Sequence, residues 1–165
     1  EFQDRHVVVT GGTGALGAAV VGLLLEAGAT CHVPVRDLKD SRRFAHRGHD
    51  RVVLTPVSDL TDEAAVASFY EALPGLWASI HVAGGFAMAP IGDTDKAMLQ
   101  QQLDTNLVSA FLCCRAAVQA MLSELGIELA VHTARQDRAG PWLRVGGRRA
   151  VVPALRQGFL PGWEL

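Results

Sequence analysis

Residues 6–17 read HVVVTGGTGALG, and this stretch decides the fold class. Its first five residues, His6 to Thr10, are mostly β-branched and apolar, as is typical of a buried parallel strand. The apolar segment Ala15 to Ala27 follows the glycines, and Gly28 is placed to cap it at its C-terminus, which predicts a helix. A strand, a glycine turn and a helix are therefore expected in direct succession.

The glycine turn carries the spacing GxGxxG at Gly12, Gly14 and Gly17. In that pattern the three glycines permit a tight turn, a close approach of the backbone to a pyrophosphate, and close packing of helix on strand. The helix N-terminus then presents free N–H groups and the positive end of its dipole to phosphates. An ordinary glycine-rich turn is the alternative, but the flanking strand and helix favour a dinucleotide-binding site.

Strand-like and helical segments continue to alternate along the chain. The expected strands cover residues 30–35, 51–57, 77–83 and 126–133. One helix is expected over residues 61–72, and one or two helices are expected over residues 93–125. Thr61 is the expected N-cap of the first of these helices. In the second helix, apolar residues recur at helical spacing at Leu99, Leu103, Leu107, Ala110 and Cys114. Because parallel neighbours need crossover connections, the alternation predicts an α/β fold with a doubly wound parallel sheet.

The composition fits one soluble domain. The chain has 165 residues, of which 49% are hydrophobic, and 15 basic against 17 acidic residues leave a net charge of −2. Its unbroken apolar runs fall far short of the roughly 20 residues of a membrane helix, so no membrane partner is expected. Cys31, Cys113 and Cys114 are an odd number without CxxC spacing, and the last two are expected to be buried thiols. A reducing, cytoplasmic setting is expected.

The end of the second expected strand bears on the choice of cofactor. A site selective for NAD usually has an acid for the ribose 2′-hydroxyl about 20 residues beyond the glycines. Here the strand ends Val35-Arg36-Asp37; Val35 cannot accept a hydrogen bond, whereas Arg36 can pair with a 2′-phosphate. NADP is therefore favoured, and Asp37 leaves NAD open. The alternative is that Arg36 is a solvated charge at a strand end.

Further matches extend the glycine motif into a family resemblance. Asp59-Leu60 follows the third expected strand, Ala83-Gly84-Gly85 ends the fourth, and Asp104-Thr105-Asn106-Leu107 lies in the long helix. With these matches, residues 5–121 resemble the cofactor-binding part of the short-chain dehydrogenase/reductase family. The resemblance implies a Rossmann-type fold whose cofactor is NADP or NAD.

The resemblance implies a role for each matched residue. Asp59 would contact the adenine edge, and Asn106 would be the catalytic asparagine. Taken alone, Asp59 could instead end a strand ahead of Thr61, Asn106 could be a hydrogen-bonded residue of its helix, and the glycine pair at 84–85 could form only a turn. The cofactor-binding residues indicated by the motif and the resemblance together are Gly11, Gly12, Thr13, Gly14, Leu16, Gly17, Arg36, Asp59, Leu60, Ala83, Gly84, Gly85 and Asn106.

The chain departs from the family at several signature positions. Ala15 stands where the family's TGxxxGxG has its middle glycine, and His81-Val82 replace the two asparagines of its NNAG segment. In the family, a tyrosine exchanges a proton with the substrate oxygen, and a lysine four residues later lowers the tyrosine pKa. The one tyrosine here is Tyr70, and Pro74 lies four residues later, so the sequence holds no Tyr-x-x-x-Lys. Thr133 lies near the place of the family's serine and could supply its hydroxyl.

The last part of the chain has a different composition. Residues 129–165 carry six basic residues, all arginines, and two acidic ones, without a basic cluster, so no nucleic-acid partner is expected. The resemblance ends near Leu122, and a shifted reading frame, a truncation, an unusual splice product and segments joined in the numbering all stay open. We assign residues 1–134 to a dinucleotide-binding domain and residues 135–165 to an atypical arginine-rich tail.

The resemblance implies reversible hydride transfer between NADP(H) and a small-molecule carbonyl or alcohol substrate, with Asn106 and Thr133 as the remaining candidate catalytic residues. A catalytically incomplete dinucleotide-binding or interaction module is the alternative, because Tyr-x-x-x-Lys is missing. Family members are commonly oligomers, which implies a homo-oligomer. The six histidines lack metal-site spacing such as HExxH, so no metal is expected. His81 is expected to be hydrogen-bonded in the core, with proton transfer as its alternative role.

Overall fold

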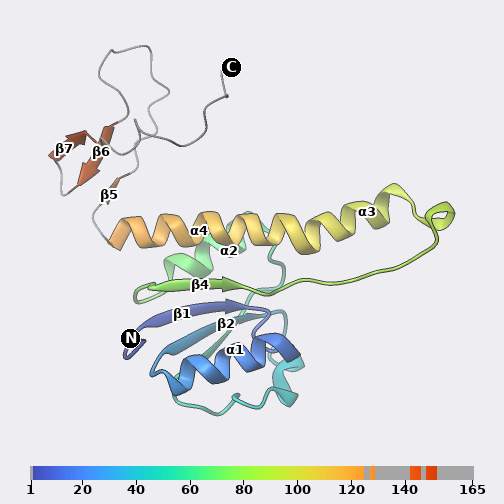
Figure 1. The fold of residues 1–165 in the computed structure, drawn as a ribbon, viewed down its shortest axis with the longest axis horizontal. Helices are drawn as coiled ribbons and strands as arrows, with labels where there is room; N and C mark the ends of the chain where they lie inside the picture. The colour runs from blue at the N-terminus through green and yellow to red at the C-terminus, as the bar shows by residue number, and fades with distance from the viewer. Residues whose placement is uncertain (1, 125–126, 129–141, 146–147, 152–165) are drawn as a thin grey trace. The chain divides into compact units, whose positions relative to one another are not determined.

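The glycine turn follows the first strand of a four-stranded parallel sheet (Figure 1). The strands run in the order β3-β2-β1-β4 and comprise β1 (His6–Thr10), β2 (Thr30–Val35), β3 (Val52–Pro56) and β4 (Ala78–His81). Every neighbouring pair is parallel. The predicted α/β fold is thus confirmed, and the strands expected over residues 51–57 and 77–83 are present with shorter bounds.

The computed structural model describes residues 2–124, 127–128, 142–145 and 148–151. The chain divides into two compact units, Glu1–Met121 and Leu122–Leu165. The division falls earlier than the expected boundary at residue 134. The glycine turn and the parallel sheet belong to the first unit.

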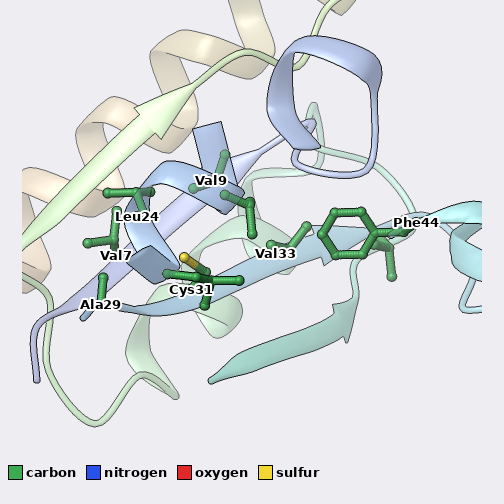
Figure 2. Close-up of a cluster of buried hydrophobic side chains, with 10 residues drawn as sticks. Val7, Val9, Leu24, Ala29, Cys31, Val33 and Phe44 are labelled. Atoms are coloured by element: carbon green, nitrogen blue, oxygen red, sulfur yellow. The ribbon is translucent and has the colours of Figure 1, made fainter. Parts of the chain in front are cut away.

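Helices cover both faces of the parallel sheet. α1 (Ala15–Glu26) lies on one face, and α2 (Glu63–Glu71) and α4 (Ser109–Glu124) lie on the other (Figure 1). A buried cluster on the α1 side includes, as labelled in Figure 2, Val7, Val9, Leu24, Ala29, Cys31, Val33 and Phe44. A second cluster joins Val8 to buried residues of α2 and α4. Because successive strand residues point to opposite faces, a sheet covered on both sides buries Val7, Val8 and Val9 alike.

The helix ends follow local capping chemistry. Ala27 is the C-cap of α1, and Gly28 directly after it has φ +93°, as expected of a glycine that ends a helix. The N-cap of α2 is Asp62, whose carboxylate accepts hydrogen bonds from two N–H groups of the first turn. The prediction that Thr61 is the cap is wrong, because the Thr61 N–H and hydroxyl both donate to Asp59 Oδ1.

The long helix expected over residues 93–125 consists of several parts. A 3₁₀ turn, η2 (Ile91–Asp93), precedes α3 (Lys96–Leu103), and a π-helical segment, η3 (Asp104–Val108), joins α3 to α4. An earlier 3₁₀ turn, η1 (Asp40–Arg43), follows β2. By length and composition alone, Lys96–Ser123 could cross a membrane. Core helices of folded domains pass the same test, and α4 contributes Leu112, Cys113, Ala116 and Ala117 to the second buried cluster.

The apolar stripe noted in the sequence is not the buried face of this helix. Leu99, Leu103 and Leu107 are 56%, 40% and 61% exposed. Cys114 is exposed too, so its expected burial is wrong, whereas Cys113 is buried as predicted. α3 has no buried residue on any face, and the buried positions of α4 are Ser109, Leu112, Cys113, Ala116 and Ala117. Regular helical spacing therefore predicts the wrong face.

The second unit contains antiparallel strands among its described residues. They are β5 (Ile127–Glu128), β6 (Trp142–Val145) and β7 (Arg148–Val151), in the order β5-β6-β7. The prediction of a parallel strand over residues 126–133 is wrong for Ile127 and Glu128, because they pair with β6 in antiparallel register. β6 pairs with β7 in antiparallel register as well. Thr133 lies outside the described residues.

Candidate functional site

The turn after β1 depends on Gly11. This residue has φ +69°, a conformation that favours glycine. A Cβ on Gly11 would also lie 2.6 Å from the Ala83 backbone nitrogen, so the turn passes close to the end of β4. Sequence analysis assigned the tight turn to Gly12, but the left-handed residue is Gly11.

Gly12 and Gly17 serve the packing of the turn. A Cβ on Gly12 would lie 2.8 Å from Val33 Cγ1, in the core of the sheet. A Cβ on Gly17 would collide with the Gly11 carbonyl oxygen and lie 2.6 Å from the Gly12 Cα atom. Both glycines therefore allow α1 to approach β1 and β2 closely, and neither lines the cleft that the turn borders.

Gly14 sits at the N-terminus of α1 and borders the cleft. It is the N-cap of the helix, with φ −75° and ψ 171°, and no side chain caps the first turn. The first N–H groups of a helix have no intrahelical acceptor, and the dipole makes this end attractive to anions. A Cβ on Gly14 would meet only the Gly11 carbonyl oxygen, at 3.3 Å. Leu16 is 68% exposed and does not line the cleft.

Arg36 and Asp37, at the end of β2, have different surroundings. Arg36 is exposed and lines the cleft. Asp37 Oδ1 accepts a hydrogen bond of 2.8 Å from the Lys39 N–H, so this carboxylate is engaged by its own loop, and Asp37 does not line the cleft. The cation is therefore the charged group that β2 presents to the cleft.

Asp59 and Leu60 follow β3 and line the same cleft. Asp59 Oδ1 accepts two hydrogen bonds of 2.8 Å, from the Thr61 N–H and from the Thr61 hydroxyl. The Thr61 N–H and hydroxyl lower the pKa of Asp59, and the Arg36 charge lowers it further. Asp59 thus stabilises the turn before α2, in agreement with the alternative that it ends a strand ahead of Thr61. It also borders the cleft.

The glycine pair after β4 is held by Asn106. Asn106 Oδ1 accepts from the Gly85 N–H at 3.0 Å, and Asn106 Nδ2 donates to the Gly85 carbonyl at 3.0 Å and to the Gln102 carbonyl at 2.9 Å. A Cβ on Gly84 would lie 2.7 Å from Asn106 Oδ1, so a side chain at this position would displace the Asn106 amide. Asn106 belongs to η3 and does not line the cleft; it positions the segment that does.

These elements enclose one cleft of about 640 Å³ at the carboxyl ends of the strands. In open α/β sheets this edge is where ligands bind. Of the residues expected to bind cofactor, the cleft is lined by Gly11, Thr13, Gly14, Arg36, Asp59, Leu60, Ala83, Gly84 and Gly85. It is also lined by Pro34, Val35, Val57, Ser58, Thr61, Val82, Phe86, Ala87, Gln101, Gln102, Thr105 and Ser109, which sequence analysis missed. Ser58 adjoins the Asp59 motif and Thr105 lies within the motif of Asn106, whereas Gln101, Gln102 and Ser109 carry no local signal.

The candidate proton donors lie away from the cleft lining. His81 is half-buried, and its Nδ1 atom is buried with no hydrogen-bond partner among the described residues, so the expected core hydrogen bond is absent at that atom. Burial lowers the pKa of His81 from its usual 6.5. Tyr70 is 3% exposed, its hydroxyl lies 2.8 Å from Ser79 Oγ, and burial raises its pKa. Within the described residues, no group of three or more metal-ligating side chains forms.

Replacing Tyr70 with phenylalanine is expected to lower the free energy of unfolding by about 1–3 kcal/mol, because the Ser79 hydroxyl loses its partner in a part-buried site. Urea denaturation measures the loss. The double variant Tyr70→Phe/Ser79→Ala is the control, since removing both partners should recover part of the loss. Strictly additive losses would show that the two hydroxyls do not interact.

A glycine turn at a helix N-terminus, open to a cleft at the carboxyl edge of a parallel sheet, defines the class of Rossmann-type nucleotide-binding domains. The family model for short chain dehydrogenases matches residues 5–127. The chain therefore belongs to the short-chain dehydrogenase/reductase family.

Relatives agree with this assignment over the first part of the chain. The short chain dehydrogenase/reductase dpchG of Colletotrichum higginsianum is 29% identical over 132 residues, which cover 74% of this chain and 48% of the relative. A short-chain type dehydrogenase/reductase from Mycobacterium ulcerans superposes with a TM-score of 0.66 at 26% identity, covering 76% of this chain and 50% of that one. The chain thus spans about half the length of these relatives.

One solved structure shares the fold and contains a dinucleotide. The short chain dehydrogenase from Leptospira borgpetersenii, with bound NAD⁺, superposes with a TM-score of 0.67 at 22% identity. The superposition covers 76% of this chain and 49% of that one.

Proposed function

We propose that the cleft binds NADP(H). The family uses NAD(P). The observation that carries the proposal is the convergence on one cleft of Gly14 at a helix N-terminus, Arg36 at the end of β2 and Asp59 at the end of β3. Gly14 would hold the pyrophosphate, Arg36 the 2′-phosphate and Asp59 the adenine edge. A dinucleotide bound there would supply the hydride. Calorimetric titration with NADPH tests the proposal, and a folded chain that takes up no NADPH would contradict it.

Arg36 supports NADP over NAD within this proposal. Arg36 borders the cleft. The neighbouring Asp37 carboxylate is the group that would favour a ribose 2′-hydroxyl, but it accepts a hydrogen bond from the backbone N–H of Lys39. A 2′-phosphate carries negative charge that Arg36 can neutralise, and a free 2′-hydroxyl does not.

The variant Arg36→Glu is expected to raise the ratio of the NADP to the NAD dissociation constant by roughly tenfold or more, because one charge-assisted contact contributes about 1.5–3 kcal/mol. Titration of both cofactors measures the ratio. Arg42→Glu, which reverses the charge of an exposed arginine outside the cleft lining, is the matched control and should leave the ratio unchanged. An unchanged ratio in Arg36→Glu would exclude Arg36 as the group that reads the 2′-phosphate.

For the parent reaction, we propose reversible hydride transfer between NADP(H) and a small-molecule carbonyl or alcohol. Family membership supports this reaction class. A catalytically incomplete binding module is the second candidate, favoured by the burial of Tyr70, the one tyrosine of the sequence, in a hydrogen bond to Ser79. NADPH binding without oxidation by carbonyl compounds would favour the binding module, and steady turnover would favour the enzyme.

The expected setting and partners also stay proposals. A reducing, cytoplasmic setting is supported by the free thiols of Cys31, Cys113 and Cys114. Neither a nucleic-acid nor a membrane partner is proposed. A homo-oligomer is supported by exposed apolar side chains on the long helix, Leu107 at 61% and Phe111 at 59%, because large exposed apolar residues mark interfaces. Sedimentation of wild type against Leu107→Ser/Phe111→Ser tests it, and equal monomeric masses would contradict it.

A further inference from the structure

Two histidines form a hydrogen bond across the centre of the parallel sheet. His6 begins β1, and His32, which is 5% exposed, lies in β2. His6 Nδ1 lies 2.9 Å from His32 Nε2, and the two ring centroids are 5.2 Å apart. His32 pairs in register with Val8, so both rings lie on the face of the sheet that packs against α2 and α4. The family motifs and the cleft use neither ring.

The chemistry of imidazole limits how many protons this pair can hold. A neutral imidazole has one N–H donor and one acceptor nitrogen, whereas a protonated imidazole has two donors and no acceptor. With both rings neutral, one donates to the other. With one ring protonated, the charged ring still donates to the neutral one. A second proton removes the remaining acceptor and places two positive charges at nitrogens 2.9 Å apart.

We propose that His6 and His32 form an acid-sensitive latch between β1 and β2, closed while either ring is neutral and open when both are protonated. The latch joins the first residue of β1 to the middle of β2, the two strands that lead to Gly11 and Arg36. The latch does not depend on which dinucleotide the cleft binds.

The groups around the pair do not offer a compensating negative charge. α2 and α4 bring two buried titratable residues to this face, Tyr70 and Cys113, and burial raises the pKa of both, that of Cys113 to about 11. Both are therefore neutral in acid. The charged residues Glu63 of α2 and Arg115 of α4 pair with each other at the surface, and Glu71, the last residue of α2, is exposed.

The other neighbouring elements contribute no carboxylate either. β3 contains no titratable residue, and β4 contains only His81. Asp4 and Arg5, which precede β1, are exposed. Burial first, and the His6 charge second, lower the pKa of His32 from 6.5 to about 4.

The lowered pKa of His32 in the folded chain sets the sign of the pH dependence of stability. Between pH 6.5 and about 4 the unfolded chain protonates His32 and the folded chain does not. The stability that His32 contributes is therefore complete above its unfolded pKa and is lost as the pH falls towards the folded value. Linkage predicts that this one group raises the unfolding equilibrium constant roughly 20-fold from pH 7 to pH 5.

The test compares urea unfolding of the full chain, without cofactor, at pH 7 and pH 5. His32→Gln keeps a group that can hydrogen-bond to His6 but does not titrate, so its unfolding constant should rise roughly 20-fold less than that of the wild type. His49→Gln, at an exposed histidine, is the matched control and should retain the wild-type dependence. Equal pH dependence in wild type and His32→Gln would overturn the proposal.

A second measurement decides the matter if His32→Gln does not fold. Proton NMR of the histidine Cε1–H signals of the wild type gives a titration midpoint for each ring. His32 should titrate far below 6.5, and His6→Gln should move the His32 midpoint upward, because it removes the neighbouring positive charge. A His32 midpoint near 6.5, or one that His6→Gln leaves in place, would overturn the latch.

Discussion

Replacement of Gly14 by valine is expected to abolish NADP(H) binding while the domain stays folded. The backbone of Gly14 is extended, with φ −75° and ψ 171°, a conformation open to any residue. A Cβ there would meet only the Gly11 carbonyl oxygen, at 3.3 Å, and the valine methyl groups would occupy space at the helix N-terminus that borders the cleft. A pyrophosphate could then no longer approach the backbone closely. Calorimetry with NADPH measures the loss.

Gly48→Val is the matched control for this experiment. A Cβ on Gly48 would have no atom within 4 Å, its φ is not positive, and Gly48 does not line the cleft. Circular dichroism of both variants establishes that they fold. Unchanged NADPH affinity in a folded Gly14→Val would show that the phosphates bind elsewhere.

The polypeptide of residues 1–165 is expected to be a very poor carbonyl reductase even with NADPH bound. Loss of a general acid alone costs about 10²–10⁴ in rate. Tyr70 cannot take that role from the core, because its hydroxyl bonds to Ser79 and burial raises its pKa. The Asn106 amide does not titrate, and its hydrogen bonds hold Gly85 and Gln102. Stopped-flow oxidation of NADPH with a panel of aldehydes and ketones measures the rate.

His81 is the residue that could contradict this expectation. It is the last residue of β4, the strand that leads to the glycine pair, but burial lowers its pKa, so the ring is mainly neutral at pH 7 and a poor proton donor. Turnover in the ordinary enzyme range of about 1–10³ per second, lost in His81→Ala and retained in the exposed control His49→Ala, would assign proton transfer to His81.

The parts of the fold that rest on local chemistry could be predicted from the sequence. The β-branched run before the glycines, the apolar helix after them and Gly28 at its end each carry a local signal, and all three have the expected structure. The strand ends that carry Arg36, Asp59 and Gly84 could also be placed, because the carboxyl ends of parallel strands share one edge.

Features that depend on distant contacts could not be predicted. The need for Gly11 arises from the backbone of Ala83, 72 positions later in the sequence, and the Asn106 side chain finds its partner at Gly85, in the loop after β4. Asp62 rather than Thr61 caps α2 because Asp59 engages Thr61 first. The choice between such competing local hydrogen bonds is made by the folded geometry rather than by residue type.

The most direct test of the cofactor site is a ¹⁵N NMR titration of the full chain with NADPH. We expect saturable shifts of the backbone amide signals of Gly11, Thr13 and Gly14, with weaker shifts at Arg36 and Asp59, whose side chains also line the cleft. Exposed amides remote from the cleft, such as that of Gly48, should not move. Shifts confined to other parts of the chain, or no shifts in a well-dispersed spectrum, would contradict the assignment of this cleft as the dinucleotide site.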